Sequence, residues 1–113
     1  MVKEFKNKKE WALIIGGSSG FGLATAKKLA KHGMNICIVH RNSRSQLVQI
    51  EKDFKKITQE AVAFVNYNID AIHPEKRILL IENLKRKLEK GKIKILVHSL
   101  AKGNLKKHHI HYN

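Results

Sequence analysis

The sequence predicts an α/β fold in which helices cover both faces of a parallel sheet. Short continuous apolar runs alternate with longer segments of helical period, and a glycine-rich stretch directly follows the first apolar run. The resulting order is β-α-β-α-β-α-β. Helical connections of this length require parallel strands and right-handed crossovers, which predicts strand order 3-2-1-4 in one half of a doubly wound sheet.

The four predicted strands are apolar along their length, as expected of strands that are covered on both faces. They are placed at Trp11–Ile15, Ile36–His40, Ala61–Tyr67 and Ile93–His98. The single cysteine, Cys37, falls inside the second of these runs. It has no partner for an internal disulfide, so its expected role is that of a small buried hydrophobe.

Amphipathic helices are predicted between the strands. The first runs from Phe21 to His32 and ends at Gly33. Ser43 or Ser45 is the expected cap of the second helix. The apolar residues of the second helix step by three and four, which predicts a buried face of Leu47, Ile50, Phe54 and Ile57.

The third helix is predicted to begin at Pro74, whose fixed φ suits a first turn, and to end at Gly91. Its predicted buried face consists of Ile78, Ile81, Leu84 and Leu88. Residues 1–104 then form one predicted domain. Residues 105–113 lose all periodicity, and a truncated or frameshifted reading frame is the simplest interpretation. The fourth strand would then be left as an unpaired edge.

The charge of the chain is strongly positive, with 23 Lys and Arg residues against 9 acidic ones and a formal net charge of +14. Nucleic acid is one partner class for such a charge. However, the lysines are spread through every segment and no aromatic residues alternate with them, which favours solvated helix faces over a nucleic-acid surface. No apolar leader or membrane-length apolar run is present, so a cytoplasmic location is expected.

The glycine-rich turn reads Gly16-Gly17-Ser18-Ser19-Gly20-Phe21-Gly22. A bound phosphate needs backbone N–H groups aimed at it and no side chain in the way, and glycine allows both. The helix that follows directs the positive end of its dipole at the same place. Because the turn joins a strand to a helix in a βαβ unit, we expect a pyrophosphate site there, against the alternative of a tight turn without a ligand.

The spacing Gly-x-x-x-Gly-x-Gly, the serine pair and the following Leu23-Ala24-x-Ala26-x-x-Leu29-Ala30 resemble the short-chain dehydrogenases/reductases. The resemblance covers Lys9 to about Asn104 and implies a Rossmann-type fold with a dinucleotide cofactor. It implies cofactor contacts from Gly16, Ser18, Ser19, Gly20, Phe21 and Gly22. The family usually has threonine before the first glycine, where this chain has Ile15.

The end of the second strand predicts the cofactor. In such folds an acidic residue there holds the ribose of NAD, whereas a basic residue accepts the 2′-phosphate of NADP. His40-Arg41-Asn42-Ser43-Arg44 contains no carboxylate. The resemblance implies that Arg41 selects NADP(H), and Arg44 could add a second contact. The alternative is that both are solvated loop arginines.

After the third strand, the family usually has an aspartate and then an aliphatic residue beside the adenine. Asn68 and Ile69 match those positions. Asp70 is left open as the functional acid instead, or as a turn residue before the third helix.

At the fourth strand, Val97-His98-Ser99-Leu100-Ala101 is similar to a segment of the enoyl-acyl carrier protein reductases of fatty acid biosynthesis, where it closes over the cofactor. His98 and Ser99 are therefore expected to contact the cofactor. A structural histidine is the alternative for His98. No metal site is predicted, because the spacing of the three tail histidines, His108, His109 and His111, fits no helical ligand pair.

The family's chemistry uses a tyrosine and a lysine in the pattern Tyr-x-x-x-Lys, or spaced more widely in the enoyl reductases. Neither Tyr67 nor Tyr112 is followed by such a lysine, so no catalytic residue is assigned and the oligomer-forming segments are also missing. The leading hypothesis is the NADP(H)-binding part of an oxidoreductase that would act on an acyl thioester only in a full-length form. The alternatives are a non-catalytic dinucleotide-binding module and, less favoured, a small basic nucleic-acid-binding domain.

Overall fold

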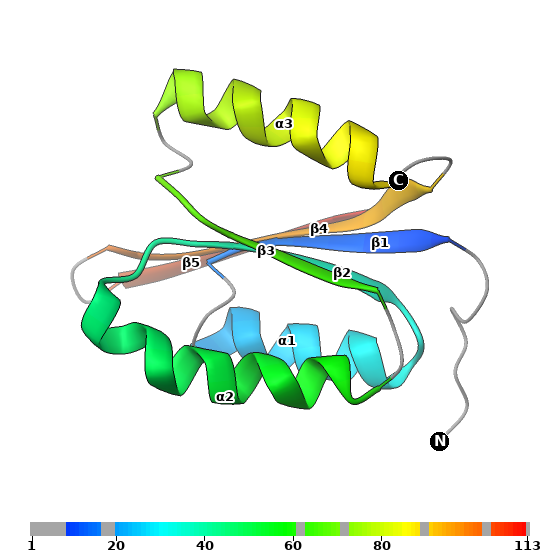
Figure 1. Cartoon of the computed structure of the whole chain (residues 1–113), viewed down its shortest axis with the longest axis horizontal. Coiled ribbons are helices and arrows are strands. Elements are labelled where there is room, and N and C mark those ends of the chain that lie inside the picture. Colours follow the sequence, from blue (N-terminus) through cyan, green and yellow to red (C-terminus); the bar gives the residue numbers. More distant parts are fainter. Residues whose placement is uncertain are drawn as a thin grey trace.

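Helices lie on both faces of a five-stranded sheet in the computed structural model (Figure 1). The structure describes residues 9–16, 20–60, 63–70, 73–88, 91–102 and 105–112. The strands are β1 (Glu10–Ile15), β2 (Asn35–His40), β3 (Phe64–Asn68), β4 (Lys92–Lys102) and β5 (Leu105–Tyr112). The helices are α1 (Gly20–Lys31), the 3-10 turn η1 (Arg44–Gln46), α2 (Leu47–Thr58) and α3 (Pro74–Leu88).

The sheet has the order β3-β2-β1-β4-β5, and its first four strands are parallel. The predicted 3-2-1-4 order of a doubly wound sheet is therefore confirmed. The register places Ile15 opposite Val39 on β2 and opposite His98 on β4, and His40 opposite Asn68. Because parallel strands end at the same edge, the segments that follow β1 to β4 come together there.

Alternate residues of the central strands face opposite helical layers. Ala12 and Ile14 of β1 belong to a cluster with the buried faces of α1 and α2, including Ala26 and Phe54. Trp11 instead joins a second cluster beneath α3. In Figure 1, α1 and α2 lie on one face of the sheet and α3 lies on the other face. Cys37 is 1% exposed, which confirms its expected burial.

The predicted face of α3 is wrong in part. Ile78 and Ile81 are 57% and 47% exposed, whereas Leu80 and Leu84 are buried and Leu88 packs beside them. The helix carries two adjacent apolar stripes, and the stripe with four-residue steps faces the sheet. Periodicity alone could not decide between them, because both fit a helical repeat.

Strand β5 was not predicted. It pairs antiparallel with β4, from Ile95 opposite Tyr112 to Lys102 opposite Leu105. The edge of β4 that the sequence analysis left unpaired is thus paired. The residues of β5 show no alternation of apolar and polar side chains, and backbone pairing does not require one. Within the described ranges, no helix is long and apolar enough to cross a membrane.

Candidate functional site

Gly16 begins the candidate site, directly after β1. Its φ is +86°, a conformation that side chains disfavour, and its N–H donates to the carbonyl of Val39 at 2.8 Å. A Cβ atom at this position would collide with the carbonyl oxygen of Ser99 on β4. The chain therefore needs glycine here both for the turn and for the close approach of β1 and β4.

The rest of the predicted turn leads into α1. Gly20 has φ +58° and is the first residue of α1, so the amino-terminal end of this helix lies at the carboxyl edge of the sheet. Phe21 is 40% exposed beside it, and Gly22 is buried. The predicted contacts at Ser18 and Ser19 lie outside the described residues.

Arg41 follows β2 at the same edge, and its guanidinium lies 3.4 Å from a carboxylate oxygen of Asp70. The side chain of Arg41 is 76% exposed, so the pair leaves most of the guanidinium accessible. Sequence reasoning treated Asp70 and Arg41 separately. The pairing of β2 with β3 was the signal that could have joined them, since His40 lies opposite Asn68. Arg44 lies on η1, one turn further along the chain.

Asn68 is engaged with the loop after β2. Its Oδ1 accepts from the N–H of Asn42 at 2.9 Å, and its Nδ2 donates to the carbonyl of Asn42 at 3.0 Å. The next residue, Ile69, donates its N–H to the carbonyl of His40 at 2.9 Å. The structure thus places Asn68 and Ile69 at the expected edge, but gives the Asn68 amide a backbone partner that the sequence did not reveal.

His40 was missed as a site residue because its imidazole was considered only as a replacement for a carboxylate. It is 3% exposed, and its ring packs edge-on against Phe54 at a centroid distance of 5.4 Å. Nδ1 lies 2.9 Å from Oδ1 of Asn42, and Nε2 lies 3.2 Å from Oδ1 of Asn66. A histidine that ends an otherwise apolar strand was the available signal.

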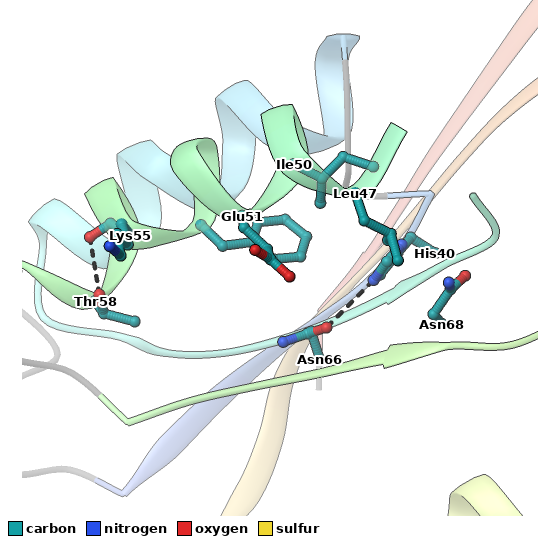
Figure 2. Close-up of a pocket in the computed structure, with 9 residues that line it drawn as sticks. His40, Leu47, Ile50, Glu51, Lys55, Thr58, Asn66 and Asn68 are labelled. Atoms are coloured by element: carbon teal, nitrogen blue, oxygen red, sulfur yellow. Dashed lines mark hydrogen bonds between the residues drawn. The ribbon is translucent and has the colours of Figure 1, made fainter. Parts of the chain in front are cut away.

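A pocket of about 430 Å³ lies between α2 and the strands β2 and β3, as Figure 2 shows. His40, Asn66 and Asn68 form its polar side. Its apolar side comes from α2 and consists of Leu47, Ile50 and Phe54. The pocket is bounded by the edge strand β3, and His40 in its lining directly precedes Arg41 in the chain.

His98 and Ser99 lie in β4, next to β1, and both are half-buried. The Ser99 carbonyl lies against Gly16, so this part of β4 borders the glycine turn. Over the residues that the structure describes, no group of three His, Cys, Asp or Glu side chains could hold a metal ion. The tail histidines have no described side-chain positions.

This arrangement, with a glycine turn and a helix amino terminus at the switch point of a parallel sheet, defines a nucleotide-binding type of α/β fold. A sequence model of the short chain dehydrogenase family matches residues 10–110. The chain belongs to this family.

The most similar curated proteins include a very-long-chain 3-oxoacyl-CoA reductase-like protein of Arabidopsis thaliana, 41% identical over 54 residues. The very-long-chain 3-oxoacyl-CoA reductase of Mus musculus is 36% identical over 67 residues, and the 17-beta-hydroxysteroid dehydrogenase type 3 of Mus musculus is 29% identical over 92 residues. These matches cover 48%, 57% and 81% of this chain. They cover only 17%, 21% and 28% of the relatives.

Solved structures of dehydrogenases are also similar to this chain. NAD+-bound xylitol dehydrogenase superposes with a TM-score of 0.66 at 28% identity, over 79% of this chain and 32% of that one. A putative dehydrogenase from Burkholderia cenocepacia with bound NADP has a TM-score of 0.65 at 18% identity, over 84% and 36% of the two chains, which supports the fold alone. The relatives named here are not enoyl reductases, so they lend no support to that narrower resemblance.

Proposed function

We propose that this chain binds a nicotinamide dinucleotide at the carboxyl edge of its sheet, with a preference for NADP(H). The observation that carries the proposal is Gly16, where a positive φ and the absence of a Cβ allow a tight turn against Ser99 of β4, at the edge of the sheet where α1 begins. A pyrophosphate fits such a place, because backbone N–H groups and the helix dipole both favour an anion without needing a side chain.

The preference for NADP(H) rests on Arg41. Residues 40–44 contain no carboxylate to hold the ribose hydroxyls of NAD(H). A guanidinium has five N–H donors, so Arg41 can keep its pair with Asp70 and still bind a 2′-phosphate. Arg44 supplies a second positive charge on η1.

The other proposed contacts follow the edge of the sheet. Ile69 is partly buried against the α3 cluster and would pack beside the adenine. His98 and Ser99 border the glycine turn and would line the floor on the nicotinamide side. When bound, the cofactor supplies the hydride, and this chain's own residues bind and orient it.

For a longer protein that contains this segment, we propose an oxidoreductase that acts on a carbonyl of an acyl thioester or a steroid. The names of the relatives support this substrate class, because they are 3-oxoacyl-CoA reductases and a hydroxysteroid dehydrogenase. Reduction of an enoyl thioester is a second candidate. It is favoured by one observation, the segment Val97-His98-Ser99-Leu100-Ala101.

Titration calorimetry of the 113-residue chain with NADPH and with NADH tests the binding proposal. Arg41→Ala should weaken NADPH binding by about 1.5–3 kcal/mol, the range for hydrogen bonds to charged groups, and leave NADH binding nearly unchanged. Lys31→Ala is the matched control, because it removes the same charge from an exposed position in the last turn of α1, ahead of the first residue of β2. Equal losses for both cofactors would show that Arg41 does not read the phosphate.

A further inference from the structure

The ends of β2 and β3 are fastened together by polar side chains, which we call the amide clasp. It consists of His40, Asn42, Asn66 and Asn68. The central contact is a pair of hydrogen bonds from the Asn68 side chain to the backbone N–H and carbonyl of Asn42, at 2.9 and 3.0 Å. Figure 2 shows the neighbouring contact, from His40 to Asn66.

The direction of the hydrogen bond between His40 and Asn42 is fixed by a backbone group. The N–H of Ser43 donates to Oε1 of Gln46 at 2.9 Å, so this oxygen is an acceptor. It also accepts from Nδ2 of Asn42 at 3.2 Å. Oδ1 of Asn42 must therefore face the imidazole, and Nδ1–H of His40 donates to it. The side chain of Asn42 is thus held on two sides.

Arg41 lies between the two residues that the clasp holds. On one side, the His40 carbonyl accepts from Ile69 N–H, and the His40 ring is buried against Phe54. On the other side, both backbone polar groups of Asn42 are bound by Asn68. The backbone of Arg41 is therefore restrained from both neighbours, while its own side chain remains 76% exposed.

We infer that Asn68 is a positioning residue for cofactor selectivity, acting through Asn42 on the guanidinium of Arg41. This inference rests on the proposed function. Its physical basis is preorganisation: a restrained backbone reduces the conformational freedom that Arg41 must lose when it binds a 2′-phosphate. His40 supports the same loop from beneath, through Asn42.

A direct contact of Asn68 with adenine predicts a different result. NADPH and NADH share the adenine and differ only in the 2′-phosphate, so losing an adenine contact would weaken both equally. Losing a positioning residue of Arg41 would weaken NADPH alone. The ratio of the two dissociation constants therefore separates the two roles.

The experiment uses the full chain and four proteins: the wild type, Asn68→Ala, Arg41→Ala and the double variant. Asn68 is exposed on the edge strand, so the substitution leaves the core intact. We expect Asn68→Ala to raise the Kd of NADPH about fivefold or more, the equivalent of one net neutral hydrogen bond, with little change for NADH. In the Arg41→Ala background, the same substitution should have no further effect on the ratio.

Thr58→Ala is the matched control, since Thr58 lines the same pocket and its hydroxyl donates to the carbonyl of Lys55 on its own helix. Equal weakening of both cofactors by Asn68→Ala, or an unchanged NADPH loss in the Arg41→Ala background, would overturn the positioning role. A wild type that binds neither cofactor, or binds them equally, would instead contradict the proposed function. Circular dichroism of each variant confirms that the comparison is between folded proteins.

Discussion

Burial makes the Cys37 thiol a reporter of folding at alkaline pH. Burial raises the pKa of Cys37 from 9.0 to about 12. Because the folded state holds the thiol proton more tightly, the thiol ionises at a lower pH in the unfolded state. The stability that this protonated thiol contributes is therefore lost between about pH 9 and pH 12 as the pH rises. The free energy of unfolding should fall with a slope of at most about 1.4 kcal/mol per pH unit.

Urea unfolding at pH 8 to 11 measures this slope, and Cys37→Ala should flatten it. Burial also raises the pKa of Tyr67, so a loss of stability with the same sign should remain in the variant above pH 10. Identical pH dependence in the two proteins would show that Cys37 ionises normally in the fold.

Gly16 has a structural role that does not depend on a bound ligand. Gly16→Ala should lower the free energy of unfolding by about 2–4 kcal/mol, since it adds strain at a positive φ and an overlap with the Ser99 carbonyl. Chemical denaturation of wild type and variant measures the loss. A change below about 1 kcal/mol would mean that β1 and β4 do not approach each other as closely as the structure has them.

Helix α3 provides a test of which apolar stripe faces the sheet. Leu80→Ala should cost about 2–4 kcal/mol of stability, because it opens a cavity beside Leu84 and Trp11. Ile81→Ala is the matched control on the exposed stripe and should change stability by no more than about 0.5 kcal/mol. Both changes are measured by urea unfolding, and the reverse order would favour the face expected from the sequence.

Elements with strong local signals could be predicted from the sequence. The apolar runs of β1, β2 and β4 and the glycines after β1 located the sheet, its order and the edge that carries the candidate site. Strand β5 could not be predicted, because its pairing uses backbone groups that carry no sequence pattern.

The contacts around Arg41 could not be predicted from the sequence either. The sequence places Arg41 and Asn68 at one edge through the parallel order of the strands. The bonds of Asn68 to Asn42 and the pair of Arg41 with Asp70 depend on the register of β2 against β3, which becomes known only when the two strands are aligned. The sequence could therefore predict the edge of the sheet at which these residues lie, but not which side chains contact each other across the strands.

For the molecule as a whole, binding without turnover is expected from these 113 residues. Hydride transfer to a carbonyl needs a proton donor, and no Tyr-x-x-x-Lys pattern occurs in the sequence. NADPH absorbance followed with a short 3-oxoacyl or trans-2-enoyl thioester should show no decay that depends on the protein. Decay with protein of verified mass would contradict this, and His98 would be the first residue to replace.

We propose that NADPH binds at the carboxyl edge of the sheet, and a two-dimensional ¹H–¹⁵N NMR titration with NADPH tests this proposal. We expect shifts of the backbone amides at the carboxyl edge of the sheet, at Gly16, Gly20 to Gly22, Arg41, Asn42 and Asn68 to Asp70. The amides at the opposite edge, such as Asn35 and Lys92, should not move. Shifts confined to that opposite edge or to the outer face of α3, or no shifts at millimolar NADPH, would contradict it.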